Sequence, residues 1–150
     1  MIIKGKFDVD VPVKKVWDVM LDVETMASCI PGVEGDTIKI DESTFDNIIF
    51  QKISFLRVKF KTRTVIKEKE PLERLTFITD GKDTMTGTVL NVKSTVFLTE
   101  ISGMKTEISY EADMRLVGRL ATFGEGLMRK KSKEIGEIVV QNMEEKIVSG

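Results

Sequence analysis

The segment KTEISYEADMRL, residues 105–116, decides the fold class of this chain. From Glu107 onward it alternates strictly between two kinds of side chain. One set is mostly apolar and consists of Ile108, Tyr110, Ala112, Met114 and Leu116, whereas the polar set consists of Glu107, Ser109, Glu111, Asp113 and Arg115. A period of two residues is the signature of a strand with one buried and one wet face. The segment therefore predicts a strand of an antiparallel sheet.

Five earlier segments carry the same signal. Strands are predicted over residues 37–41, 44–54, 58–68, 74–80 and 84–100, with turns at residues 41–43, 81–83 and 102–103. In two of these strands the alternation separates one face from the other. That face carries Val58, Phe60, Thr62, Thr64 and Ile66 in one strand, and Leu90, Val92, Ser94, Val96 and Leu98 in the other. A further strand over residues 2–11 begins the chain.

Helical spacing flanks this β-rich stretch on both sides. Residues 12–21 begin with Pro12 and predict a short amphipathic helix, and residues 23–29 predict a second one. From residue 119 to residue 147 the apolar residues again recur at helical spacing, which predicts a helix of roughly 40 Å. Gly124 and Gly126 predict a break near residues 123–126.

The order of these elements predicts one α+β domain over residues 1–150. A curved antiparallel sheet of about six to seven strands would wrap around the long C-terminal helix, with two short helices after the first strand. Such a sheet cannot close tightly along the whole helix, so we expect a mostly apolar cavity between the two. The predicted ligand-binding residues line it: Phe60, Thr62, Phe77, Leu90, Val92, Ile108, Tyr110, Ala112, Met114, Phe123, Leu127, Ile135 and Asn142.

The amino-acid composition limits the kinds of catalytic and metal-binding site that this chain can form. The 150 residues include no histidine and one cysteine, and the formal net charge is −1. Ser-His and Cys-His nucleophile pairs and imidazole metal ligands are therefore excluded, and no intrachain disulfide can form. There is also no basic excess of the kind that marks nucleic-acid binders. We predict no catalytic set, metal or cofactor, and favour binding over catalysis without deciding between them.

Four features have both a structural and a functional interpretation. Cys29 is a buried small residue or a nucleophile, and Tyr110 is a core aromatic or a hydrogen-bond donor to a ligand. Asn142, in the apolar stripe of the last helix, pairs with the sheet or with a ligand. The basic run of Arg129, Lys130, Lys131 and Lys133 is a solvated face or a contact to an anionic lipid surface.

Three stretches resemble a known family. They are G-x-F-x-V at residues 5–9 with VW at 16–17, then D-x-E and C-I-P-G-V-E between residues 22 and 34, and Y-E-A-D at 110–113 followed by V-G-R-L-A-x-x-G at 117–124. Together they resemble the CoxG family of carbon monoxide dehydrogenase subunits, which is similar to the START-like (SRPBCC) helix-grip superfamily. The resemblance implies a helix-grip fold around an apolar cavity.

The resemblance also implies partners. It suggests an accessory protein of a molybdenum-containing carbon monoxide dehydrogenase or related hydroxylase, acting in assembly, membrane association or electron transfer to a quinone. The implied ligand is a quinone or a lipid. A cyclase- or hydrolase-type enzyme on the same cavity and a pure protein–protein adaptor remain alternatives. Charged residues from Lys4 onward predict no signal peptide, and no apolar run approaches the ~20 residues of a membrane span, so we expect a cytoplasmic protein with or without peripheral membrane contact.

Overall fold

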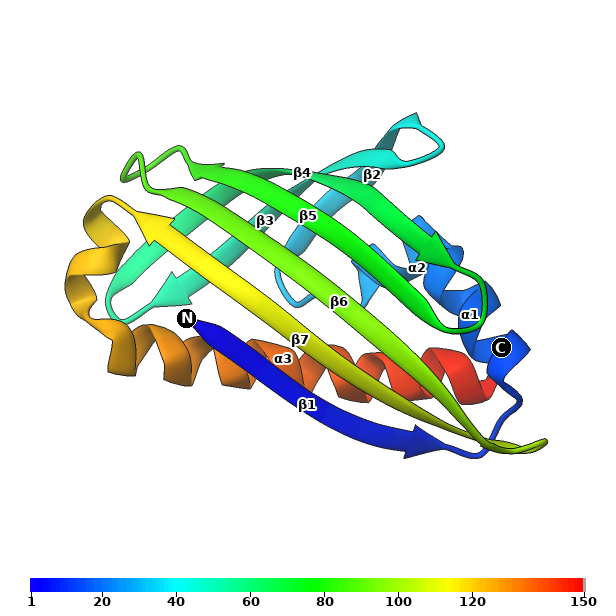
Figure 1. Ribbon diagram of the computed structural model, residues 1–150. Coiled ribbons are helices and arrows are strands. Elements are labelled where there is room, and N and C mark those ends of the chain that lie inside the picture. Colours follow the sequence, from blue (N-terminus) through cyan, green and yellow to red (C-terminus); the bar gives the residue numbers. More distant parts are fainter. Residues whose placement is uncertain (150) are drawn as a thin grey trace.

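A single antiparallel sheet dominates the computed structural model, which describes residues 1–149 (Figure 1). Its seven strands are β1 (Ile2–Val9), β2 (Val33–Asp41), β3 (Thr44–Ile53), β4 (Leu56–Glu70), β5 (Arg74–Asp83), β6 (Val89–Ser102) and β7 (Lys105–Val117). The helices are α1 (Val13–Leu21), α2 (Val23–Ser28), the 3₁₀ helix η1 (Arg119–Phe123) and α3 (Glu125–Ser149). The predicted fold class is confirmed, including the two short helices after the first strand.

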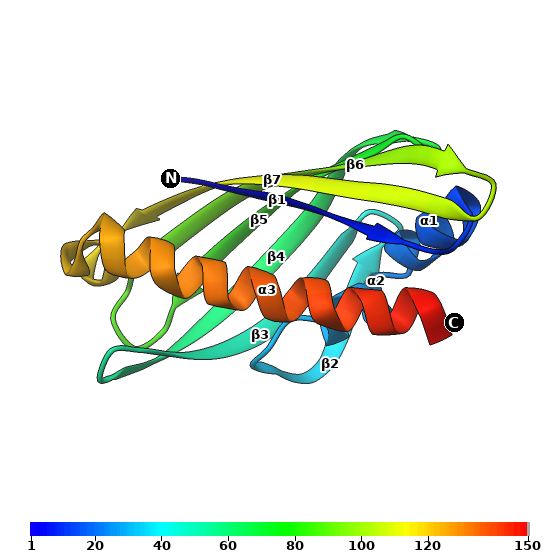
Figure 2. The ribbon, with the colours of Figure 1, turned by 90° about the horizontal axis from the view of Figure 1, so that it is seen from below.

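The strand order is β1-β7-β6-β5-β4-β3-β2. Strands β2 to β7 form a continuous meander, and β1 joins it at the far edge by pairing with β7. The sheet curves, and α3 runs obliquely across its concave side (Figure 2). Helices α1 and α2 cover the end of the sheet that also receives the C-terminal end of α3.

The predicted break before the long helix is confirmed. Residues 119–123 form η1, and Gly124 separates it from α3. Gly118 and Gly124, which flank η1, have φ angles of +125° and +93°. L-residues with a Cβ rarely adopt these angles, so the two glycines permit the turn.

The predicted turn at residues 81–83 is wrong. Gly81, Lys82 and Asp83 belong to β5, and the chain turns after them, over residues 84–87. The cause is the side chain of Asp83, which accepts hydrogen bonds from the backbone N–H groups of Lys59, Met85 and Thr86. These bonds hold Asp83 opposite Phe60 and delay the start of β6 to Val89.

Two separate hydrophobic clusters hold the sheet and helices together. The first lies at the α1 end and unites residues such as Trp17, Ile108 and Ile147. The second lies near the β3–β4 turn and consists of Ile53, Val58, Phe60, Leu120 and Met128. Between them the concave face is lined by side chains that belong to neither cluster.

The turn before β2 requires a glycine at position 32, and this requirement can be tested by substitution. An added Cβ would lie 1.9 Å from the carbonyl oxygen of Phe50, and the φ angle of Gly32 is +89°. We expect Gly32→Ala to lower the free energy of unfolding by about 2–3 kcal/mol, because both strain and a backbone clash must be relieved. Gly35→Ala is the matched control, since Gly35 has a φ of +71° with no atom within 4 Å of the added Cβ. Equal losses in urea denaturation would contradict the role given to the clash.

Candidate functional site

Strand register places the predicted strand residues on one face of the sheet. The cross-strand pairs include Phe77 with Ser94, Val92 with Met114, and Ser94 with Ala112. Residues directly opposite each other in an antiparallel pair point to the same side. This side faces α3, because Phe60 packs in one cluster with Met128 of that helix.

The middle of the concave face carries hydroxyl and amide groups. The Thr62 hydroxyl donates to the Asn47 carbonyl oxygen at 3.2 Å, and the Asn47 amide donates to the Thr37 hydroxyl at 2.8 Å. The Thr64 and Thr79 hydroxyl oxygens lie 2.8 Å apart in a shared hydrogen bond. A hydroxyl group offers one donor and two acceptor positions, so each retains capacity for another partner.

Apolar side chains continue this middle section toward β7 and α3. Val92, Ala112, Met114 and Ile135 are half-buried and belong to neither hydrophobic cluster. We call these four, together with Thr62, Thr64, Thr79 and Ser94, the central band. Of these eight residues, Thr62 and Thr64 are buried, and the other six retain accessible surface although they lie where the sheet faces α3.

The predicted helix residues do not gather at one place. Phe123 lies in η1, where its ring meets that of Phe55 edge-on at 6.1 Å, and Leu127 is 37% exposed. Ile135 is in the central band. Asn142 lies 15 residues beyond Leu127, which is about 22 Å along a helix, and its amide donates to the Cys29 carbonyl oxygen at 2.9 Å. The hydrogen bond that the Asn142 amide needs is therefore supplied by the protein itself, not by a ligand.

Tyr110 leans across the first strand. An added Cβ on Gly5 would lie 2.5 Å from the Tyr110 hydroxyl oxygen, so the ring occupies the space that this glycine leaves open. Burial and the nearby carboxylate of Glu137 both raise the pKa of Tyr110 above its ordinary value. At neutral pH the phenol is therefore protonated and can donate a hydrogen bond.

Cys29 is a packing residue at the end of α2. It is fully buried, and its thiol donates to the carbonyl oxygen of Thr25 at 3.4 Å. Burial raises the pKa of the Cys29 thiol, which keeps it protonated and weakly nucleophilic. Across residues 1–149 no three Cys, Asp or Glu side chains converge as metal ligands would.

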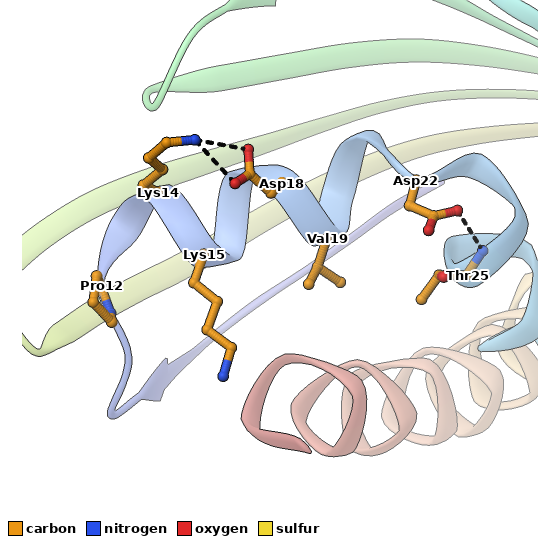
Figure 3. A pocket seen from close by; sticks show the side chains of 7 residues that line it. All are labelled: Pro12, Lys14, Lys15, Asp18, Val19, Asp22 and Thr25. Carbon is orange, nitrogen blue, oxygen red and sulfur yellow. Dashed lines mark hydrogen bonds and ion pairs between the residues drawn. The ribbon is translucent and has the colours of Figure 1, made fainter. Parts of the chain in front are cut away.

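Two hollows lie on the surface, away from the central band. One, of about 610 Å³, is lined by Pro12, Lys14, Lys15, Asp18, Val19, Asp22 and Thr25 (Figure 3). Lys15 points from it toward the end of α3, where its ammonium group donates to the Val148 carbonyl oxygen at 3.4 Å. The other, of about 340 Å³, lies over β1 and β7 and includes Gly5, Phe97 and Tyr110. Both are shallow and have charged rims.

Sequence reasoning missed Asp83, the most enclosed carboxylate on the concave side. It is fully buried and accepts hydrogen bonds from both the backbone and the hydroxyl of Thr86. The signal was present in the segment D-T-M-T-G, residues 83–87, because an aspartate before short polar residues and a glycine often caps its own turn. Asp83 therefore shapes the β5–β6 connection at one end of the central band.

A comparison with models of protein families shows to which family the chain belongs. The model for CoxG, a subunit of carbon monoxide dehydrogenase, matches residues 5–148. The chain belongs to the CoxG family. No curated protein matches its sequence.

Several solved structures have a fold similar to that of this chain. A conserved protein from Geobacillus kaustophilus is similar with a TM-score of 0.89 and 17% identity, covering 99% of this chain and 96% of that one. A START superfamily protein from Mycobacterium smegmatis has a TM-score of 0.73 at 10% identity, with coverage of 99% and 97%. The Zhui aromatase/cyclase from Streptomyces sp. R1128 has a TM-score of 0.70 at 10% identity, with coverage of 98% and 93%. This CoxG family member therefore has the helix-grip fold of START-like proteins. Within residues 1–149, none of the helices has the length and apolar character to cross a bilayer.

Proposed function

We propose that this CoxG family member binds a small neutral hydrophobic molecule, a quinone or a lipid, between the sheet and α3. The observation that carries the proposal is the central band, where six of the eight inward-facing side chains stay half-buried between two packed clusters. Binding sites for apolar molecules combine an apolar lining with a few placed polar groups. Val92, Ala112 and Met114 supply the apolar surface.

The hydroxyl groups indicate the polarity of the ligand. Thr62, Thr64 and Thr79 offer hydrogen-bonding groups without charge. Asp83 lies on the same face, diagonal to Thr62, but its carboxylate is engaged by hydrogen bonds from Lys59, Met85 and Thr86. A charged group would lose its hydration there without a counter-charge, which is costly. A carbonyl or hydroxyl oxygen, as in a quinone or an acylglycerol, fits this lining.

The family suggests which enzyme the protein works with, because it is named for a subunit of carbon monoxide dehydrogenase. We infer that the protein serves a molybdenum-containing carbon monoxide dehydrogenase or a related hydroxylase, by holding the hydrophobic molecule during assembly or electron transfer. Tyr110 fits this binding role as a protonated donor, and the Asp83 carboxylate is already engaged by its own turn.

Mass spectrometry of a solvent extract from the natively purified protein tests the proposal. We expect a stoichiometric quinone or lipid from the wild type. Val92→Phe, which fills the central band, should lower ligand content at least about fivefold with the fold retained. Lys93→Phe is the matched control, because Lys93 is the exposed neighbour on the opposite face of β6. Extracts without ligand from wild type, or equal losses in both variants, would contradict the proposed site.

A further inference from the structure

The concave face of the sheet carries one phenol, and its hydroxyl group has no partner in the protein. Tyr110 is the only tyrosine of the chain, and it lies on the same face of β7 as Ile108 and Ala112. No side-chain hydrogen bond within residues 1–149 includes its hydroxyl group. A tyrosine hydroxyl inside a protein usually has a hydrogen-bond partner. This one is therefore available to another molecule.

Gly5 determines where that hydroxyl group lies. It is directly opposite Tyr110 in the β1–β7 pair. A Cβ added to Gly5 would lie 2.5 Å from the hydroxyl oxygen and 2.8 Å from the ring carbon that bears it. A glycine inside a strand weakens the strand, and the close approach of another group is a common reason for its presence. The ring thus lies in space that any other residue type would fill. Its orientation is set before a ligand arrives, which reduces the entropy lost on binding.

Tyr110 lies at the border between the first hydrophobic cluster and the central band. Its ring packs against that cluster, whereas Ala112, the next residue on the same face of β7, belongs to the central band. Helix α3 contributes Glu137 to this place, two residues after Ile135 of the central band. The phenol therefore stands at one end of the proposed ligand site and is protonated at neutral pH, as described above.

We propose that Tyr110, positioned by Gly5, donates a hydrogen bond to a carbonyl oxygen of the ligand and so selects carbonyl-bearing molecules. This inference rests on the proposed function, because it assigns the polar end of the molecule bound there. A carbonyl oxygen only accepts hydrogen bonds, so it complements a hydroxyl group whose proton has no other acceptor. The Thr62 hydroxyl differs, because its proton is already donated to the Asn47 carbonyl oxygen. A site built around such a donor discriminates against an analogue that lacks the acceptor.

Equilibrium dialysis of the full chain with a matched pair of probes tests the proposal. Duroquinone, a tetramethyl benzoquinone, and durene, a tetramethylbenzene, share one carbon skeleton, and only the quinone has carbonyl oxygens. We expect Tyr110→Phe to weaken binding of duroquinone about three- to tenfold, because one hydrogen bond is lost. Binding of durene should stay within about twofold of wild type, because the phenyl ring is retained. Ser109→Ala is the matched control, since it removes a hydroxyl group from the opposite face of β7.

Gly5→Ala tests the positioning role of the glycine. The added Cβ should displace the ring of Tyr110 and produce the same selective loss of duroquinone. Combined with Tyr110→Phe, it should cause no further selective loss, because both substitutions remove one contact. Gly103→Ala is the control, since no atom lies within 4 Å of its added Cβ, and it should bind both probes as wild type does.

Infrared spectroscopy of bound duroquinone provides a readout that packing alone would not change. A hydrogen bond to a carbonyl oxygen weakens the C=O bond and lowers its stretching frequency. We expect the carbonyl band to lie at a lower frequency in wild type than in Tyr110→Phe. The band in Ser109→Ala should coincide with that of wild type.

The possible failures separate this inference from the proposed function. If Tyr110→Phe loses affinity for both probes equally, the ring only packs, and if it loses none or leaves the carbonyl band unshifted, the hydroxyl group serves no ligand. Either result overturns this inference alone, provided that Val92→Phe still excludes both probes. A wild type that binds neither probe would overturn the proposed function and this inference together.

Discussion

Replacing Trp17 with alanine is expected to lower the free energy of unfolding by about 3–5 kcal/mol. Trp17 lies on α1, is only 6% exposed, and shares a cluster with Leu98 and Ile108 of the sheet and with Ile147 of α3. One side chain therefore joins three layers of the fold. Its removal leaves a large cavity at the place where α3 meets the sheet, and the helix would lose its anchor at that end.

Urea denaturation followed by far-UV circular dichroism measures this effect. Fluorescence is unsuitable for the variant, because Trp17 is the only tryptophan of the chain. Phe55→Ala serves as the control: Phe55 is an aromatic residue that is mostly exposed, and we expect it to change stability by less than about 1 kcal/mol. A loss below about 1.5 kcal/mol for Trp17→Ala would show that the surrounding side chains collapse into the space.

Asp83→Ala is expected to cost about 3 kcal/mol of stability. The carboxylate is fully buried and satisfies the backbone N–H groups of Lys59, Met85 and Thr86. Without it these part-buried donors lose their partner, and a donor left without a partner away from water costs more than the hydrogen bond itself contributes. The β5–β6 connection should also become mobile, as faster amide hydrogen exchange at residues 84–87 would show.

The same site predicts a pH dependence with a defined direction. Burial of the carboxyl by itself would raise the pKa of Asp83, but hydrogen bonds from Thr86, Lys59 and Met85 outweigh it and hold that pKa below its ordinary value. The stabilisation is therefore complete above the unfolded-state pKa of about 3.9 and is lost as the pH falls through the lower folded-state pKa. The stability difference between wild type and Asp83→Asn should be constant near neutral pH and shrink below about pH 4.

Asp80→Asn is the control for Asp83→Asn. Asp80 lies on the same strand but is exposed, and its carboxylate accepts one hydrogen bond from the side chain of Asn91 at 2.7 Å. Its substitution should change stability by less than about 1 kcal/mol. An equal effect of both substitutions would contradict the role of the buried hydrogen-bond network around Asp83.

Local pattern was sufficient for most of the architecture. Alternation in residues 105–116 and 58–66 predicted which side chains share a face, and the register of β4 to β7 confirms it. Gly124 and Gly126 predicted the interruption before α3, because a helix loses stability at such residues. These features depend on neighbours within a few positions along the chain, which a sequence displays directly.

Features that depend on distant residues were predicted less well. The turn at residues 81–83 was misplaced because Asp83 binds the backbone of Lys59, which is 24 positions away. The predicted helix residues Leu127 and Asn142 lie about 22 Å apart along α3, and Asn142 is engaged by Cys29, 113 positions away. Helical spacing shows that residues share a stripe, but not how far along the partner sheet each of them lies.

The sequence by itself determined that this chain forms an antiparallel sheet with one wet face, a long final helix and an interior without histidine, because periodicity and composition are local properties. The tertiary structure alone decided two matters. It divided the core into two clusters with the central band between them. It also brought Lys52, Arg57, Lys59, Lys61 and Lys82 together at one end of a chain that is nearly neutral overall. Both result from strand register, which brings residues that are far apart in the chain side by side on one face of the sheet.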